Sequence, residues 1–416
     1  MHRVAITGLG VLAPNGCGKQ AFADGLWSGR NGVSRIDAFD PTGFKSQIAG
    51  QLPPNALADV GASLPTKDRV VQIALMAARE AMADAGLECL PDDIDPGRFG
   101  VSIANAIGGT KLMTEHYPDI TANGTTPLEV ASAYSALHLS ATFNTPAVAV
   151  ADEYALGGPV VTLTTGCTGG NDAIGFAFDA VRRGEADLML AGAAEAPITP
   201  FVVACFDVIG ALSVRNDEPE HASRPFDASR DGFVLAEGAG IAVLERWDHA
   251  VDRGIPILGE VLGFGSSANA FHMTDLASHG SDLARSFQLA LDDARLPAER
   301  IGYVNAHGSS TPQNDLCETN AVKKVLGDRA YETPVSSIKS MVGHALAAAN
   351  ALEFVGSVLA LGERVLPPTI NHNAPGESCD LDYVPNEARE TRFDTVASLS
   401  SGFGGIHSTV ILGRAA

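Results

Sequence analysis

The sequence predicts an α/β protein in which layers of helices cover a sheet. Three observations support this prediction. Short runs of β-branched and apolar residues alternate with helical stretches along the whole chain, as is typical of strands that share a sheet and helices that pack on it. The 416 residues are 45% apolar and include 44 glycines, which is enough for a large buried core with many turns. The helical stretches are rich in alanine, which permits close packing.

Each predicted element rests on a local pattern. Strands are expected at Arg3–Ile6, Phe99–Ile103, Val160–Leu163, Leu188–Ala191, Gly240–Leu244, Gly302–Asn305 and Thr395–Leu399. Helices are expected at Lys67–Ala85, Asp172–Arg182, Leu283–Ala294, Glu318–Val325 and Ala345–Leu361, where apolar residues recur at helical spacing. The polar, turn-rich segment Arg215–Asp231 is expected to be an ordered surface crossover. A boundary near Trp247–Ile255 divides the chain into two halves, residues 1–250 and 251–416.

The first strand leads into glycines. Gly8-Leu9-Gly10 is weakly similar to a dinucleotide-binding fingerprint, but the third glycine of that fingerprint is out of place. The residues that follow, Val11 to Gly16, have the composition of a turn and not of a helix start. We therefore predict a tight turn at these glycines and no NAD site.

Composition excludes several classes of protein. The formal net charge of -21 argues against nucleic-acid binding, and an acidic partner would need a local basic patch. No apolar run approaches the roughly 20 residues that span a bilayer, and Met1 leads almost directly into a strand, so neither a membrane anchor nor a signal peptide is expected. Six cysteines without a C-x-x-C pair favour a reduced, cytoplasmic protein without disulfides or a metal site.

The most informative stretch is 160–175, VVTLTTGCTGGNDAIG. It predicts a strand that turns sharply into a helix, with Cys167 at the turn. At such an elbow the amides and dipole of the helix N-terminus favour the thiolate, which is the reactive form. A buried, inert cysteine is the alternative that this stretch alone leaves open.

Three further segments carry candidate groups. In YVNAHGSSTPQNDLCE a strand delivers His307 to a loop with the hydroxyls of Ser309 and Thr311. In SSIKSMVGHALAAANAL a lysine, Lys339, and a histidine, His344, precede an alanine-rich helix. In LSSGFGGI glycines flank an aromatic residue, so the backbone amides of this loop can approach a ligand. Taken singly, each histidine is also consistent with a loop hydrogen bond or a helix cap.

Together these groups suit one kind of chemistry. A thiolate accepts an acyl group as a thioester, and two neutral imidazoles that donate hydrogen bonds stabilise an enolate oxygen. The combination favours carbon–carbon bond formation by thioester condensation. A cysteine protease needs only one histidine with an Asn or Asp, which would leave the second histidine and the lysine unused.

At this point the chain resembles a known family. The segments VAITGLG, GCTGG, SRPFDASRDGFVLAEGAG, NAHGSSTPQND, IKSMVGHALAAANALE and SGFGG are similar, over essentially the whole length, to β-ketoacyl-[acyl carrier protein] synthases. The resemblance implies an α/β, thiolase-like fold of two pseudo-repeated halves in αβαβα layers. It also implies substrates carried on the phosphopantetheine of acyl carrier protein, with neither a metal nor a redox cofactor.

Within that family, ITPFVVACFDVIGALSVRNDEPEHASRPFD and TTGCTGG most resemble the ketosynthase-alpha subunits of type II polyketide synthases. Those subunits form heterodimers with a related chain-length-factor subunit, in which Gln typically replaces the nucleophilic Cys. Because this chain keeps Cys167, the resemblance implies the catalytic member of the pair.

The resemblance also implies roles for individual residues. Cys167 is the nucleophile, and His307 and His344 support decarboxylation and stabilise the enolate. The amides of Cys167 and Phe403 form an oxyanion hole, and the ring of Phe403 is a gate. Lys339 and Glu318 form a charged pair that holds the geometry of the site.

For the substrate, the resemblance implies that Ser309 and Thr311 contact the phosphopantetheine arm. Ile107 and Phe206 line the acyl tunnel, with plain core packing as the alternative.

Some residues depart from the polyketide pattern. Ser309-Ser310-Thr311-Pro312 is closer to the fatty-acid form, and Gly210 stands where relatives commonly have an Arg that binds carrier protein. Lys67 and Arg69 remain as candidate docking cations. The mixture is consistent with a reduced or polyene product as well as an aromatic one.

Two alternatives stay open. The first is a homodimeric fatty-acid ketosynthase; the second is a non-elongating decarboxylating or scaffold subunit, against which the intact Cys167, His307 and His344 argue. A degradative thiolase is a poorer fit. The thiolase would need a second late cysteine, and the only one, Cys379, lies in a sequence, GESCDLD, that predicts a surface position.

Overall fold

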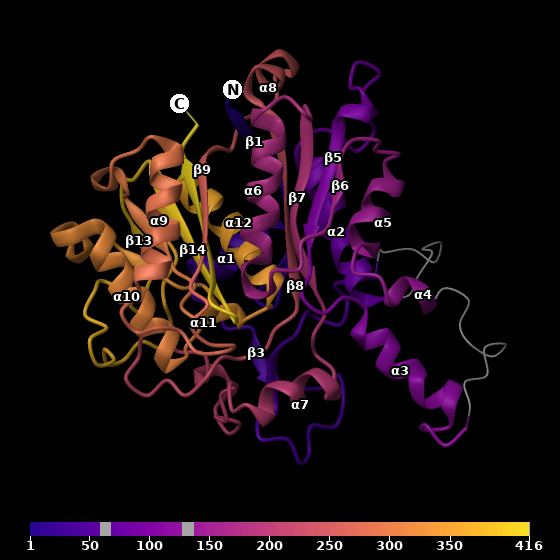
Figure 1. Cartoon of the computed structure of the whole chain (residues 1–416), viewed down its shortest axis with the longest axis vertical. Coiled ribbons are helices and arrows are strands. Elements are labelled where there is room, and N and C mark those ends of the chain that lie inside the picture. The colour runs from indigo at the N-terminus through magenta and orange to yellow at the C-terminus, as the bar shows by residue number, and fades with distance from the viewer. Residues whose placement is uncertain (59–67, 127–136, 416) are drawn as a thin grey trace.

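The computed structural model describes residues 1–58, 68–126 and 137–415 (Figure 1). The strands are β1 (Val4–Ala13), β2 (Gly16–Cys17), β3 (Val33–Arg35), β4 (Ile48–Gly50), β5 (Phe99–Ala104), β6 (Val160–Val161), β7 (Leu188–Glu195), β8 (Gly238–Arg246), β9 (Gly259–Ala268), β10 (Tyr303–Asn305), β11 (Val335–Ser336), β12 (Val365–Leu366), β13 (Arg389–Glu390), β14 (Thr395–Gly402) and β15 (Ile406–Gly413). The α-helices are α1 (Lys19–Trp27), α2 (Arg69–Asp84), α3 (Thr110–Thr121), α4 (Leu137–Ser140), α5 (Thr145–Glu153), α6 (Gly169–Arg182), α7 (Pro200–Val208), α8 (Trp247–Arg253), α9 (Ser281–Ala294), α10 (Pro312–Leu326), α11 (Lys339–Val342) and α12 (Ala347–Glu363).

The main sheet is mixed and internally repeated. Its order is β11-β10-β14-β15-β9-β1-β8-β7-β5-β6. From the outer edge inward, the strands are β11, β10, β14, β15 and β9 in one half and β6, β5, β7, β8 and β1 in the other. When these five strands are numbered along the chain in each half, both halves have the order 3-2-4-5-1. The halves meet where β1 pairs antiparallel with β9, with Val4 opposite Val261. In each half the outer three strands run parallel, and the fourth and fifth are antiparallel partners.

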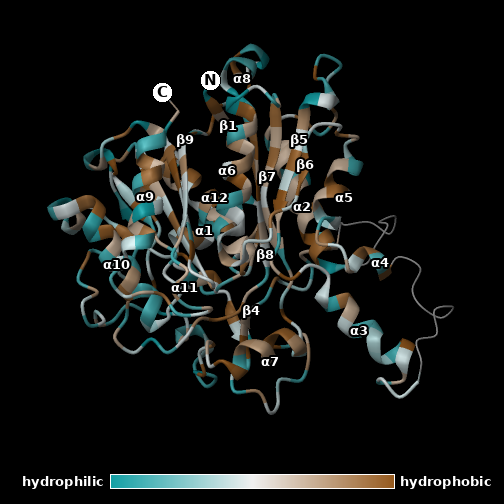
Figure 2. Cartoon of the chain, viewed as in Figure 1, coloured by the Kyte–Doolittle hydropathy of each residue, from teal (hydrophilic) through white to brown (hydrophobic). Residues whose placement is uncertain are grey.

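Helices form three layers around this sheet (Figure 1). The helices α6 and α12 lie between the two halves, α2 and α5 cover one outer face, and α9 and α10 cover the other. The resulting order is αβαβα, and the predicted thiolase-like fold is confirmed. Hydrophobic residues concentrate on the central strands, and hydrophilic residues on the loops and outward helix faces (Figure 2). None of the helices in the described ranges is long and apolar enough to cross a bilayer.

The central helices touch through small residues. Nearly all of α12 is buried, and a Cβ added at Gly170 on α6 would lie 2.6 Å from the backbone nitrogen of Ala351 on α12. Backbone therefore packs directly on backbone, as the alanine- and glycine-rich sequence predicts. This contact fixes the start of α6 against the start of α12, and both starts carry residues of the site.

Most predicted elements are present, but two predictions are wrong. The glycines Gly8 and Gly10 form no turn, and β1 continues through them to Ala13. They are needed for another reason: a Cβ at Gly10 would lie only 1.9 Å from the carbonyl oxygen of Ala77 on α2. The glycines let a helix approach the strand. The segment Arg215–Asp231 is not all surface. Its residues 222–227 are buried, and hydrogen bonds join them to Asp315 of α10 and to the loop amides of Asn373 and Ala374.

Candidate active site

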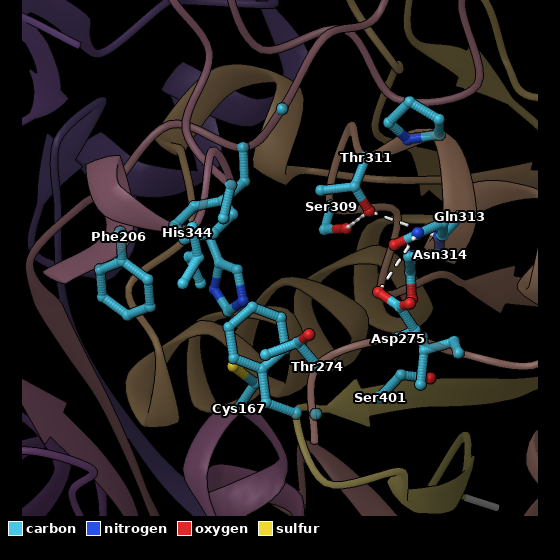
Figure 3. A pocket seen from close by; sticks show the side chains of 18 of the residues that line it. Cys167, Phe206, Thr274, Asp275, Ser309, Thr311, Gln313, Asn314, His344 and Ser401 are labelled. Carbon is cyan, nitrogen blue, oxygen red and sulfur yellow. Dashed lines mark hydrogen bonds between the residues drawn. The ribbon is translucent and has the colours of Figure 1, made fainter. Parts of the chain in front are cut away.

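Three of the four main predicted site residues follow the carboxyl ends of strands, where α/β sheets place ligand sites. Cys167 comes after β6, His307 after β10 and Phe403 after β14, while His344 lies between α11 and α12. All four line one cavity of about 360 Å³. Figure 3 shows Cys167, Phe206 and His344 on one side of this cavity and Ser309 and Thr311 on the other.

Cys167 lies on a 3-10 turn, Gly166–Thr168, that leads into α6. Gly166 has a φ of +64°, a left-handed conformation that glycine adopts without strain. Asp172, in the first turn of α6, accepts hydrogen bonds from the hydroxyls of Thr165 and Thr168. The elbow predicted from the sequence is therefore present, and its backbone is fixed from both sides.

The electrostatics of Cys167 differ from the prediction. Burial raises the pKa of its thiol to about 11, so desolvation outweighs the effect expected from the helix N-terminus and the resting form is the thiol. The charge of Lys339 and hydrogen bonds from the amides of Phe403 and Cys167 lower this pKa, whereas the charge of Glu195 raises it. Both amides that the resemblance assigns to an oxyanion hole thus point at the sulfur.

His307 and His344 form a pair of neutral imidazoles. Their ring centroids are 5.1 Å apart at an interplanar angle of 85°, and each side chain is only 3% exposed. Burial lowers the pKa of both rings well below the usual value, and the positive charge of Lys339 lowers it further. Neutral rings keep N–H donors that gain strength when a negative charge develops beside them.

The tautomer of His307 follows from its neighbour. The ammonium of Lys339 lies 3.3 Å from Nδ1 of His307 and donates to the His307 carbonyl at 2.7 Å. An ammonium has donors only, so Nδ1 must accept and the ring proton must lie on Nε2. We infer that Nε2–H is the donor of this ring.

The predicted pairing of Lys339 with Glu318 is wrong. Lys339 forms its ion pair with Glu353 of α12, and both side chains are buried. Glu318 instead accepts hydrogen bonds from the amides of His307 and Gly308, at 2.6 and 2.7 Å, and so holds the histidine loop. Burial raises the pKa of Glu318 to about 8 and that of Glu353 to about 7.

The predicted substrate-binding residues lie around the same site. Ser309 and Thr311 line the cavity, with their hydroxyl oxygens 3.0 Å apart (Figure 3). Phe206 of α7 also lines it, and its ring lies 6.4 Å from that of Phe403. Ile107 packs in the apolar cluster that contains Cys167 and Phe206 but is not among the residues that line the cavity.

Phe403 occupies a glycine-rich turn between β14 and β15. Its side chain is 41% exposed, and the next residue, Gly404, has a φ of +82° and donates a backbone hydrogen bond to Met273. An aromatic ring on such a turn, at the mouth of the cavity, is placed as a gate would be.

Two predictions on surface residues need correction. Arg69 is not a free cation, because its guanidinium forms an ion pair with Glu237 at 2.6 Å; Lys67 lies outside the described residues. Cys379 is buried, not on the surface, and packs in the cluster that contains Phe226. That cluster surrounds α9 and α10 and does not include Cys167.

Three further residues support the site and were not predicted from the motifs: Glu353, Phe233 and Glu195. The ring of Phe233 packs edge-on against His344 at 5.2 Å. A signal was present for the two acids, since Glu195 is the one acid of the apolar strand β7 and Glu353 lies within the apolar part of α12, ten residues before its terminal Glu363. Buried acids without a functional or structural role are rare.

Comparison with known proteins gives a consistent result. The β-ketoacyl synthase N-terminal domain matches residues 1–250, and the β-ketoacyl synthase C-terminal domain matches residues 258–373. The chain is 48% identical to a putative polyketide beta-ketoacyl synthase 1 of Streptomyces cyaneus, over 99% of this chain and 98% of the relative. It is 46% identical to the tetracenomycin polyketide synthase ketoacyl synthase alpha subunit of Streptomyces glaucescens, over 99% and 97%.

Solved structures agree. A ketosynthase in complex with its type II polyketide acyl carrier protein, bound to the hexaketide, superposes with a TM-score of 0.93 at 43% identity, with both chains fully covered. A beta-ketoacyl synthase from Burkholderia phymatum superposes with a TM-score of 0.91 at 36% identity, again with full coverage of both chains. The family expected from the motifs is confirmed: this chain belongs to the β-ketoacyl synthases.

Proposed function

We propose that the chain is the catalytic ketosynthase-alpha subunit of a type II polyketide synthase. The observation that carries this proposal is the convergence of one cysteine and two neutral imidazoles, Cys167, His307 and His344, on a single cavity. Relatives at 44–48% identity with polyketide names over the full length support the polyketide assignment.

The first half-reaction loads the acyl chain. Cys167 loses its proton and attacks the carbonyl carbon of an acyl thioester on the carrier protein. The amides of Cys167 and Phe403 stabilise the oxyanion, the carrier thiolate leaves and takes up a proton, and the acyl group stays on the sulfur. The charge of Lys339 offsets part of the cost of forming a buried thiolate.

The second half-reaction makes the carbon–carbon bond. Malonyl-carrier protein enters, and the bond to its free carboxylate breaks with release of CO2. N–H groups of His307 and His344 donate to the enolate oxygen that forms. The enolate carbon then attacks the acyl thioester, which expels the Cys167 thiolate and gives the β-ketoacyl product. No metal or redox step enters this scheme.

The same proposal names two partners. Acyl carrier protein supplies both substrates on its phosphopantetheine, with Ser309 and Thr311 as contacts for the arm. A chain-length-factor subunit completes a heterodimer; a structure described as the ishigamide ketosynthase/chain length factor superposes at a TM-score of 0.91 and 34% identity. We assign the nucleophile to a half formed by residues 1–250 and the histidines to a half formed by 251–416.

Intact-protein mass spectrometry tests the proposal. Incubation with an acyl-carrier protein is expected to add one acyl mass to the wild-type chain and none to Cys167→Ala. Elongation by the Cys167→Ala variant at the wild-type rate would overturn the assignment.

A fatty-acid ketosynthase is the second candidate. The 3-oxoacyl-[acyl-carrier-protein] synthase 2 of Coxiella burnetii is 43% identical over 99% of both chains, and the SSTP segment is closer to that class. Co-purification with a homologue that lacks the cysteine favours the polyketide function. A stable, active homodimer favours fatty-acid synthesis.

A further inference from the structure

Glu195 is a buried acid that the mechanism above does not use. It is the last residue of β7, and its side chain has no exposed surface. In the described structure its carboxylate oxygens accept hydrogen bonds from backbone amides. The amide of Ala106 donates at 2.7 Å and that of Ile107 at 3.4 Å, and the amide of Ala347 donates as well.

These amides belong to two segments that border the site. Ala106 and Ile107 lie in the loop after β5, in or beside the apolar cluster of Cys167. Ala347 is the first residue of α12 and lies three positions after His344. One carboxyl therefore holds both segments.

The start of α12 needs this support. Leu346, its N-cap residue, has a φ of +48° and gives no side-chain cap hydrogen bond. A left-handed conformation costs free energy for leucine and persists only where neighbours impose it. A carboxyl at a helix N-terminus satisfies a free amide and interacts favourably with the helix dipole. Glu195 thus caps α12 from another strand.

The cysteine elbow packs on the same spot. A Cβ added at Gly169, two residues after Cys167, would lie 3.0 Å from Cβ of Ala347 and 3.1 Å from Cβ of Ala104. The elbow, the end of β5 and the start of α12 are therefore in direct contact, and a shift of one displaces the others.

We propose that Glu195 is a positioning residue that ties the Ile107 loop to the His344 turn and so sets the distance between Cys167 and His344. The roles of those two residues rest on the proposed function. The carboxyl touches neither the sulfur nor the imidazole; it acts through the backbone that carries them.

The charge of Glu195 adds a second effect. Burial raises the pKa of Glu195 to about 8, and in its charged form it raises the pKa of Cys167. The other groups that face the sulfur are Lys339, whose charge lowers that pKa, and the neutral rings of His307 and His344. Above pH 8 the ionised Glu195 therefore opposes formation of the thiolate.

Two substitutions separate the effects. Glu195→Gln removes the charge and keeps an oxygen for one amide, whereas Glu195→Ala removes both. Glu80→Gln is the matched control, because Glu80 also accepts from two backbone amides, those of Val11 and Lys19, but on the opposite side of the sheet from α6 and α12.

The experiment measures two rates for each variant. The first is alkylation of Cys167 by iodoacetamide between pH 6 and 10, and the second is single-turnover condensation of the acylated enzyme with malonyl-carrier protein. Glu195→Gln is expected to alkylate about threefold faster at pH 9, because removal of a nearby negative charge lowers the pKa of Cys167 and so raises the thiolate fraction. Its condensation is expected to fall about tenfold, and that of Glu195→Ala about 100-fold, as misplaced groups do. Glu80→Gln is expected to change neither rate.

Loss of structure would also expose Cys167 and speed its alkylation, so urea denaturation is measured beside the two rates. Faster alkylation with slower condensation, at the wild-type denaturation midpoint, is the result that supports the proposal. Condensation at the wild-type rate in both Glu195 variants overturns the proposal. An equal fall in the alkylation and condensation rates overturns it too, if Glu80→Gln shows the same fall. Should Glu195→Ala fail to fold, Glu195→Gln decides by the same two rates. Absence of condensation in the wild-type chain, with the alkylation shift present, refutes the proposed function and still supports the effect of the Glu195 charge on Cys167.

Discussion

Lys339 is a buried ammonium that serves three neighbours at once. It forms an ion pair with Glu353, holds the carbonyl and Nδ1 of His307, and its charge lowers the pKa of Cys167. A buried pair of this kind is costly to break, because the remaining charge has no partner. Lys339 thus contributes to the stability of the fold, to the orientation of His307 and to the pKa of Cys167.

Substitution of Lys339 separates its contribution to stability from its contributions to the site. Lys339→Met is expected to lower the free energy of unfolding by about 3–5 kcal/mol, since Glu353 is left without a cation. Lys339→Met combined with Glu353→Gln is expected to recover most of that loss, yet to decarboxylate malonyl-carrier protein at least about tenfold more slowly than wild type. Urea denaturation and CO2 release measure the two quantities. Wild-type decarboxylation by the double variant would contradict this role.

At the residue scale the sequence predicts which residues share the cavity better than it predicts their supports. The motifs predict that Cys167, His307 and His344 share one site, because each lies in a short, distinctive segment, and all three line one cavity. The predicted partner of Lys339, Glu318, is wrong because the observed pair with Glu353 depends on how α11 and α12 pack. The thiol pKa was also misjudged, since burial is a property of the folded cavity and not of the elbow.

At the scale of elements, the contact between α6 and α12 is the joint that aligns the site. The first turn of α6 follows Cys167, and the first turn of α12 follows His344. Gly170 allows the two backbones to touch, so any added atom at this point pushes the helices apart.

A single methyl group tests this joint. Gly170→Ala places a Cβ 2.6 Å from a backbone nitrogen and is expected to destabilise the protein by about 1–3 kcal/mol, with a loss of condensation. Gly362→Ala is the control: this glycine also lies in α12, but nothing lies within 4 Å of its added Cβ, so stability is expected to stay equal or rise by up to about 1 kcal/mol. Chemical denaturation compares the two. Equal stability of both variants would rule out the tight joint.

Strands and helices with strong periodicity are predictable from the sequence. The role of a glycine within them is less predictable. The β1 glycines were assigned to a turn because local composition favours one, whereas the approach of α2 makes them strand residues. The polar composition of Ala222–Asp227 predicts a surface segment, but its polar groups are satisfied by the helix α10 and by a loop, both distant in sequence. Both errors come from contacts that a local pattern does not contain.

At the scale of the whole molecule, the repeated sheet encloses a core with several buried titratable groups. Burial raises the pKa of Glu195, Glu318 and Glu353 to between about 7 and 8, and lowers the pKa of His307 and His344. The layered fold was predictable from the family motifs. The placement of these groups was not, because it depends on how the two halves close on each other.

These groups make stability depend on pH. A carboxyl with a raised folded pKa binds a proton that the unfolded chain has lost above pH 4.5, so its contribution declines as pH rises toward its folded pKa. A histidine with a lowered folded pKa stays neutral in the folded protein while the unfolded chain takes up a proton, so the protein loses stability as pH falls below 6.5. The two effects oppose each other below pH 6.5, and the carboxyls act alone above it.

The free energy of unfolding is therefore expected to fall between pH 6.5 and 8, by about 1.4 kcal/mol per pH unit for each carboxyl that stays protonated. Urea denaturation across this range measures the slope. Glu195→Gln is expected to reduce it, and a wild-type slope of zero would contradict the assigned protonation.

The mechanism as a whole depends on one division of labour: one sulfur holds the acyl chain, and two imidazoles then act on the malonyl thioester. A single-turnover assay tests it most directly: the chain is acylated on Cys167, mixed with malonyl-carrier protein, and followed for loss of the acyl-enzyme and release of CO2. His307→Ala and His344→Ala are expected to accept the acyl group normally, and then to keep it with CO2 release at least about 100-fold slower than wild type. Condensation at the wild-type rate in both variants would contradict the account.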